Sequence, residues 1–263
     1  MIVGTVSERG SEVESITPGD RVCFFSGFRE TAIVDADRCF VMPEGMSWKS
    51  AVCIDPADFA MAAVRDGHVR IGDRVAVFGL GAIGLVVIQF ARLSGAETVI
   101  GVDPLPNRRD VAQQLGATAT LDPSSMDAGL AIKELTGHLG VDVAIEYSGS
   151  RQGLQQALRG VAYGGTVVMG AFPPAYEAGL DFGAEAHLNT PKIVFSRACS
   201  QPDREHPRWT EKRILDVCWR LLAEGRITGE PIVQPIVSIK DLLDEYPKIA
   251  SDPGQNVKLG VRY

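Results

Sequence analysis

Three glycines and one downstream carboxylate carry the most informative chemistry in this sequence. Gly79, Gly81 and Gly84 follow the G-x-G-x-x-G spacing, and Asp103 stands about twenty residues beyond the last of them. Apolar runs flank the glycines on both sides, which predicts a strand, a tight turn and the start of a helix. In that context the turn is typical of a site that holds the pyrophosphate of a dinucleotide.

Each position of the predicted turn has a physical role. Gly79 permits a sharp exit from the strand, Gly81 leaves room for phosphate oxygens, and Gly84 lets the helix pack closely. Free N–H groups at the helix start, around Ala82 and Ile83, favour the negative pyrophosphate. We therefore expect these five residues to contact the cofactor. The alternative is a glycine turn that binds no nucleotide.

Asp103 ends the second predicted strand of this unit. A carboxylate there accepts hydrogen bonds from the ribose hydroxyls and repels a 2′-phosphate, which favours NAD over NADP. Arg108 is a further candidate for cofactor contact. Arg108 and Arg109 are close enough to Asp103 that NADP remains an alternative cofactor, although both also fit the start of the next helix. Ser148 and Gly149 follow a later strand and are candidates too, because ligands of such sheets bind at the carboxyl ends of the strands.

Between residues 57 and 198 the sequence alternates β-rich runs with amphipathic segments. This repetition predicts an α/β fold with a doubly wound parallel sheet, a Rossmann dinucleotide-binding domain. The expected strands are 75–78, 98–103, 118–121, 141–146, 166–169 and 192–195, and the expected helices include 107–115, 126–136 and 152–161.

The two flanks have a different pattern. Short alternating runs at 2–7, 21–25 and 31–35 predict antiparallel strands near the N-terminus. Near the C-terminus the sequence predicts a helix at 209–223 and strands at 232–239 and 257–261. We expect residues 1–56 and 199–263 to fold together into a second domain, with the nucleotide domain, 57–198, inserted between them.

Composition limits the class of protein. The 263 residues are 45% hydrophobic, carry a net charge of −7 and contain no basic run, which argues against nucleic acid or an anionic membrane as a partner. No secretory leader is recognisable, so a cytoplasmic location is expected. The five cysteines are widely spaced and form no C-x-x-C pair, which favours reduced thiols over a disulfide framework.

Four segments together give the chain a recognisable pattern: Pro18-Gly19-Asp20-Arg21-Val22, Val75–Gly84 with Asp103, Gly140–Glu146, and Val257-Lys258-Leu259. The chain resembles the medium-chain dehydrogenase/reductase superfamily, and in particular its zinc-type alcohol and polyol dehydrogenases of the sorbitol-dehydrogenase kind. This resemblance implies a Rossmann domain inserted into a GroES-like β domain. It also implies NAD(P)-dependent oxidation of an alcohol, polyol or sugar, and a homo-oligomer, dimer or tetramer. By family position, Gly170 and Ser196 would face the nicotinamide.

The catalytic zinc site of these relatives is only partly represented. Their Gly-His-Glu-x-x-Gly segment would end at Gly4, which puts Met1 at the glutamate and the other ligands upstream. The chain is therefore expected to lack the N-terminal part of the catalytic domain. Asp55, followed by Pro56, resembles a family ligand position and is the sole metal candidate; the alternative is a helix cap. A four-cysteine structural zinc site is not expected.

No catalytic residue is assigned from the sequence. The histidines, His68, His138, His187 and His206, stand singly, and a lone histidine is more often a surface residue than a catalyst. The first hypothesis is an NAD-dependent dehydrogenase that transfers hydride between an alcohol carbon and nicotinamide. The alternatives are a catalytically reduced NAD-binding protein without the zinc site, and a zinc-independent reductase of the quinone oxidoreductase branch.

Overall fold

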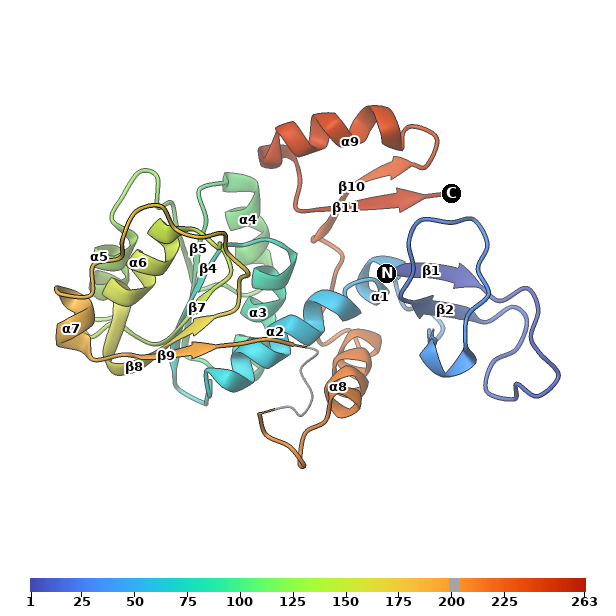
Figure 1. Ribbon diagram of the computed structural model, residues 1–263, viewed down its shortest axis with the longest axis horizontal. Helices are drawn as coiled ribbons and strands as arrows, with labels where there is room; N and C mark the ends of the chain where they lie inside the picture. The colour runs from blue at the N-terminus through green and yellow to red at the C-terminus, as the bar shows by residue number, and fades with distance from the viewer. Residues whose placement is uncertain (199–203) are drawn as a thin grey trace.

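A six-stranded parallel sheet forms the centre of the protein (Figure 1). The structure is a computed structural model that describes residues 1–198 and 204–263, so Cys199 lies outside the described residues. The sheet order is β6-β5-β4-β7-β8-β9. Its strands are β4 (Arg74–Phe78), β5 (Thr98–Val102), β6 (Ala119–Leu121), β7 (Val141–Glu146), β8 (Val161–Met169) and β9 (Lys192–Phe195).

The strand order confirms the predicted doubly wound fold. β4 lies between β5 and β7, with Ala76 opposite Ile100 on one side and Ala144 on the other. The chain therefore builds outward from β4 in one direction and then restarts at β7 in the other. The crevice where ligands bind in such sheets lies at this reversal, beyond the carboxyl ends of β4 and β7.

Both faces of the sheet are covered because successive side chains of a strand point to opposite faces. Val75 and Val77 join one buried cluster, and Ala76 and Phe78 join the other. The first cluster includes residues of α2 (Ile54–Asp66), α3 (Ala82–Leu93), α4 (Pro106–Gln114) and α8 (Glu211–Ala223). The second includes residues of α5 (Ala128–Leu135), α6 (Arg151–Gly160) and α7 (Glu185–Asn189).

The N-terminal flank is a small antiparallel sheet, in the order β1-β2-β3, as its sequence pattern predicts. Its strands are β1 (Ile2–Thr5), β2 (Arg21–Phe24) and β3 (Phe40–Val41). The prediction of a strand at 31–35 is wrong: the segment is irregular and leads into a short 3-10 helix, η1 (Ala36–Arg38). Ile33 is fully exposed, so the alternation there has no core to face.

The C-terminal flank forms a parallel pair, β10 (Val233–Ser238) and β11 (Lys258–Arg262). The helix α9 (Leu242–Ser251) and a 3-10 turn, η2 (Pro253–Gln255), connect the two strands. Helix α2 begins before residue 57, and its Met61 contacts Cys218 of α8 at 3.9 Å between sulfur atoms, so α8 of the C-terminal flank packs on a helix at the start of the nucleotide domain.

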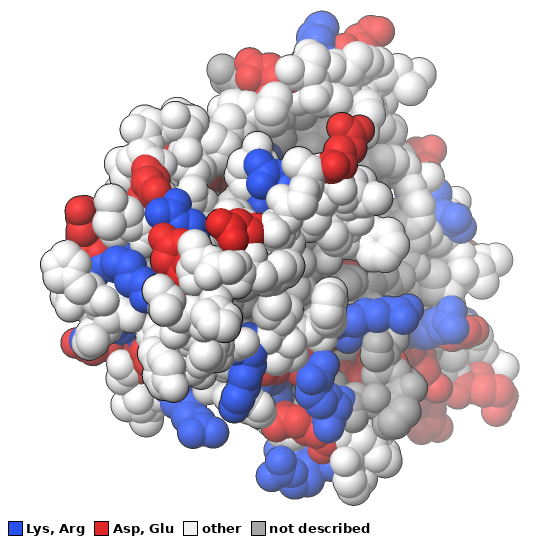
Figure 2. Space-filling view, turned by 60° about the vertical axis from the view of Figure 1, so that its left-hand side comes forward, with Lys and Arg blue, Asp and Glu red and all other residues white. Residues whose placement is uncertain are grey.

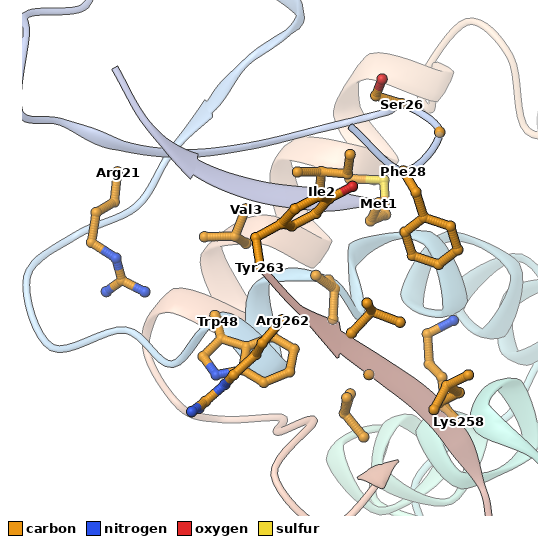
Figure 3. Close-up of a pocket in the computed structure, with 16 residues that line it drawn as sticks. Met1, Ile2, Val3, Arg21, Ser26, Phe28, Trp48, Lys258, Arg262 and Tyr263 are labelled. Carbon is orange, nitrogen blue, oxygen red and sulfur yellow. The ribbon is translucent and has the colours of Figure 1, made fainter. Parts of the chain in front are cut away.

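The two flanking sheets remain separate, and a pocket of about 590 Å³ lies between β1 and β11 (Figure 3). Trp48, from the short helix α1 (Trp48–Ala51), lies beside the pocket with the Arg262 guanidinium 5.3 Å from its ring centre. Arg21 and Lys258 also line this pocket. None of its lining residues belongs to the predicted cofactor or metal set. Among the described helices, none is both long and apolar enough to span a membrane.

Candidate dinucleotide site

The glycine turn has the geometry that its sequence predicts. Gly79 has a φ of +86°, a conformation that L side chains rarely adopt, and its N–H donates to the Val102 carbonyl at 2.9 Å. A Cβ on Gly79 would lie 2.5 Å from the Ser148 nitrogen, and one on Gly84 would collide with the Gly79 carbonyl. These two glycines let the turn, the helix and the end of β7 meet closely.

The start of α3 is open toward an anion. Gly81 is the N-cap residue of α3, and no side chain caps the helix there. A Cβ placed on Gly81 would have no atom within 4 Å, so the space beside it is open. The first N–H groups of a helix, here including those of Ala82 and Ile83, have no intrahelical acceptor. The first turn of α3 contains no acidic residue. Space, free donors and the helix dipole therefore fit a pyrophosphate group.

Asp103 is placed where the sequence predicts it, directly beyond β5 and against the glycine turn. It is only 2% exposed. Its Oδ2 accepts from the Leu80 N–H at 2.8 Å and its Oδ1 from the Leu105 N–H at 2.9 Å. Each carboxylate oxygen keeps acceptor capacity beyond these bonds, which fits a ribose hydroxyl donor.

The two arginines near Asp103 have different surroundings. Arg108 Nη1 lies 3.7 Å from Asp103 Oδ2, and its Nε is buried without a partner in the described part of the chain. Arg109 donates to the Asp103 carbonyl at 2.7 Å and pairs with Asp122 at 3.4 Å. Both begin α4, as predicted, and only Arg108 keeps an unused buried donor.

Ser148 and Gly149 lie at the reversal of the sheet, as expected, but their N–H groups are already used. Both donate to the carboxylate of Glu146, the last residue of β7, at 2.7 and 3.1 Å. Glu146 is fully buried, and burial raises the pKa of its carboxyl above the ordinary value. Sequence reasoning did not select Glu146. The signal was an acid that follows the apolar run Val143-Ala144-Ile145, immediately before a Tyr-Ser-Gly turn.

Gly170 and Ser196 lie at the carboxyl ends of the last two strands of the sheet. A Cβ on Gly170 would collide with the ring of Tyr147, so this glycine seats that ring. The Tyr147 hydroxyl donates to the Phe59 carbonyl of α2 at 2.9 Å. The Ser196 N–H donates to the Met169 carbonyl, and its Oγ is buried with no partner among residues 1–198 and 204–263.

Asp55 lies in the first turn of α2, where a carboxylate also suits a helix N-terminus. The described residues contain no group of three His, Cys, Asp or Glu side chains that could hold a metal ion. The neighbouring Cys53 is fully buried, and burial raises the pKa of its thiol to about 12, so it is a protonated thiol at neutral pH. The donor set of the described residues does not fit a catalytic zinc, which needs three protein ligands. Asp55 as a ligand stays a prediction.

The segment that contains His206 is held at the far end of α2 from Asp55. Glu205 pairs with Arg65, whose guanidinium lies 3.5 Å from the ring centre of Trp209, and Arg204 pairs with Asp66 at 3.1 Å. Asp55 and Arg65 are about 15 Å apart along the helix axis at 1.5 Å per residue. A histidine beside Arg65 is therefore remote from Asp55, the metal candidate of the sequence.

Comparisons with known proteins agree with this geometry. Residues 82–207 match the family described as zinc-binding dehydrogenase. The whole chain is 47% identical to D-guloside 3-dehydrogenase of Escherichia coli (strain K12) and covers 76% of that protein. It is 32% identical over 221 residues to (R,R)-butanediol dehydrogenase of Bacillus subtilis (strain 168), with 83% of this chain and 59% of the relative covered.

The fold is also that of a solved relative. The structure of 2R,3R-butanediol dehydrogenase from Bacillus subtilis matches with a TM-score of 0.79 and 26% identity, covering 99% of this chain and 79% of that one. The 47% identity to D-guloside 3-dehydrogenase extends over the full length of this chain. The resemblance therefore includes both flanks as well as the nucleotide domain. The chain therefore belongs to the zinc-binding dehydrogenases of the medium-chain dehydrogenase/reductase superfamily.

Proposed function

We propose that this protein is an NAD-dependent dehydrogenase that oxidises a secondary alcohol of a sugar or polyol. The observation that carries the proposal is the open N-terminus of α3 placed beside the buried carboxylate of Asp103. Together they offer donors to a pyrophosphate and acceptors to a ribose. The 47% identity to D-guloside 3-dehydrogenase supports a sugar-like substrate.

The preference for NAD rests on charge. The family uses NAD or NADP. In this chain the Asp103 carboxylate would stand against a 2′-phosphate. The two nearby cations that could offset the repulsion are both paired, Arg108 with Asp103 itself and Arg109 with Asp122. We therefore assign NAD as the cofactor.

Bound NAD⁺ supplies the hydride acceptor of the reaction. In the proposed complex the residues of the chain bind and orient it: the α3 N-terminus, with Gly81, Ala82 and Ile83, holds the pyrophosphate, and Asp103 with Arg108 holds the adenosine ribose. Gly170 and Ser196 lie on the side proposed for the nicotinamide. The protein groups named here act without zinc, because residues 1–198 and 204–263 contain no three-ligand group.

The wider setting is part of the same proposal. Acidic and basic side chains are interspersed over the face shown in Figure 2, and the chain has a net charge of −7, which supports a small-molecule partner rather than nucleic acid. The four cysteines that the structure describes are free thiols, which supports a cytoplasmic location. We also propose a homo-oligomer assembled through the edge strand β9.

The test is turnover by the purified chain with NAD⁺ and a D-guloside, sorbitol or 2,3-butanediol, followed as NADH formation. The matched variants are Gly81→Asp and Gly179→Asp. Both glycines have open space where a Cβ would stand and neither has a positive φ, so both variants should fold. Gly81→Asp puts a negative charge where the pyrophosphate is proposed to bind, and should abolish NADH binding and turnover.

Gly179→Asp should retain both properties. Equal NADH affinity in the two variants would contradict the proposed site. A wild-type chain that binds NADH but oxidises none of the alcohols would favour the second candidate, an NAD-binding protein of reduced activity. That candidate is supported by the missing three-ligand group among the described side chains. The two candidates are distinguished by adding zinc to the purified chain and measuring both the metal bound and the alcohol-dependent formation of NADH.

A further inference from the structure

Glu146 is a buried acid for which hydride transfer has no evident use. It is fully buried at the carboxyl end of β7, next to β4 in the sheet. In the part of the chain that the structure describes, it forms no ion pair with a lysine or arginine. An unpaired buried carboxylate costs stability, so packing alone does not account for it.

The carboxylate instead binds the turn that follows it. Its Oε1 accepts from the Ser148 N–H at 2.7 Å, from the Gly149 N–H at 3.1 Å, and closely from the Ser148 hydroxyl. Its main-chain carbonyl accepts from the N–H groups of Gly170 and Ala171 at 3.0 and 3.1 Å. One residue thus fixes the loops after β7 and after β8 together.

The turn after β7, residues 147–149, also packs directly against the glycine turn at Gly79. A Cβ on Gly79 would meet the Ser148 nitrogen at 2.5 Å and its Cα at 2.7 Å, so the Ser148 backbone occupies the space that a side chain at position 79 would need. On the other side, Ser148 Oγ lies 3.0 Å from Ser150 Oγ, which caps α6 by accepting from the Gly153 N–H at 2.9 Å. Ser148 is held between Gly79 and the start of α6, and Glu146 supplies the bonds that hold it.

We infer that Glu146 is a positioning residue for the dinucleotide. By binding Ser148 and Gly149, it fixes the backbone segment that packs against Gly79 and so sets the shape of the glycine turn. The inference rests on the proposed function, because it assigns a role in the binding of the same cofactor. Glu146 contacts the turn and not the reacting atoms. Its loss should therefore weaken dinucleotide binding and leave the chemical step nearly unchanged.

The test compares Glu146→Gln with Glu185→Gln in the full chain, with NADH as the probe. Glu146 Oε2 also accepts from the Gly149 N–H, at 3.3 Å. A glutamine that keeps its oxygen at the Oε1 position puts an N–H₂ donor at the Oε2 position, facing the Gly149 N–H, so the turn must shift. We expect the Kd of NADH and the KM of NAD⁺ to rise about tenfold, the loss of one charge-assisted hydrogen bond, with kcat within about twofold. Glu185 bonds to Arg159 on α6, away from the turn, and its variant should bind NADH as the wild type does.

Stability separates positioning from a structural role. Because Glu146→Gln removes a buried charge, the urea midpoint of the cofactor-free variant should not fall below that of the wild type at neutral pH. A double-mutant cycle with Ser148→Ala adds a second reading: the effect of Ser148→Ala on NADH affinity should be largely lost in the Glu146→Gln background, since both act through one contact.

The outcomes are distinct. An unchanged Kd for NADH in Glu146→Gln, or a lower urea midpoint with an unchanged KM, would overturn the inference and leave the proposed function intact. Additive effects of the two substitutions would also contradict it. A wild-type chain that binds neither NADH nor NAD⁺ would overturn the proposed function and, with it, the inference.

Discussion

Asp103 performs two tasks with one carboxylate. It accepts the N–H groups of Leu80 and Leu105, which fixes the glycine turn, and it presents the remaining lone pairs beside Arg108. The isosteric Asp103→Asn variant keeps an acceptor oxygen and loses the charge. We expect the ratio of kcat/KM for NAD⁺ to that for NADP⁺ to fall by about tenfold or more, because the repulsion of a 2′-phosphate is removed.

Asp142→Asn is the matched control for this cofactor preference. Asp142 is a carboxylate near the amino end of β7, at the opposite end of the strands from the glycine turn, where it accepts from the Arg74 N–H at 2.8 Å. Steady-state kinetics with both cofactors should show a much smaller change in the ratio for Asp142→Asn. If the Asp103→Asn ratio stays at the wild-type value, Asp103 does not face the ribose.

Glu146 predicts an unusual pH dependence of stability. Burial raises the pKa of its carboxyl above 4.5 in the folded chain, against the hydrogen bonds from Ser148 and Gly149. Since protonation is then favoured by folding, its stabilising contribution is complete below pH 4.5 and is lost as pH rises through the folded-state pKa. The free energy of unfolding of Glu146→Gln should therefore increase relative to that of the wild type as pH rises. Urea titrations between about pH 4 and pH 7 measure this difference.

Glu185→Gln gives the opposite sign in the same titrations. The hydrogen bond from Arg159 lowers the pKa of Glu185, so its contribution to stability is present above the unfolded-state pKa and is lost on acidification. The free energy of unfolding of the wild type should thus increase relative to that of Glu185→Gln as pH rises. Parallel curves for wild type and Glu146→Gln would show that the Glu146 pKa is not raised by folding.

At the scale of elements, Tyr147 connects the end of β7 to α2. Its ring lies against Gly170 and its hydroxyl donates to the Phe59 carbonyl. Tyr147→Phe should lower the free energy of unfolding by about 1 kcal/mol, the net contribution of one such hydrogen bond. Tyr163→Phe, at an 80% exposed tyrosine of β8, is the control and should cost much less in urea denaturation. Equal losses would mean that the link to α2 adds no stability.

The nucleotide domain was predictable because its elements repeat one pattern. Its strands are mostly short apolar runs, such as Val75–Phe78, and turns and helix starts separate them with their own local signals, so all six strands were found. The strand predicted at 31–35 failed because alternation without a partner sheet does not fix a strand. Glu146 was missed because its role depends on contacts with Ser148 and Gly79, and spacing alone does not show that the end of β7 meets the glycine turn.

At the scale of the whole molecule, the four-residue strand β9 is the last strand at one edge of the central sheet, and no described strand pairs with its outer side (Figure 1). Its Ile193 and Phe195 are 42% and 73% exposed, and Leu188 of the adjacent α7 is 71% exposed. An unpaired strand edge with apolar neighbours is a template for pairing with another chain. A two-fold axis would set β9 antiparallel to its own copy and close the assembly at two chains.

We therefore expect the 28.2 kDa chain to elute as a dimer in size-exclusion chromatography with light scattering. The double variant Ile193→Lys/Phe195→Lys should be monomeric, because it puts like charges across the two-fold pairing and removes apolar contact. Ile33→Lys, at a fully exposed isoleucine of the N-terminal flank, is the control and should remain dimeric. Affinity for ADP-ribose, which lacks the nicotinamide, should persist in the monomeric variant, since the glycine turn and Asp103 lie away from β9 in the sheet. A dimer that survives the β9 substitutions would place the interface on another face.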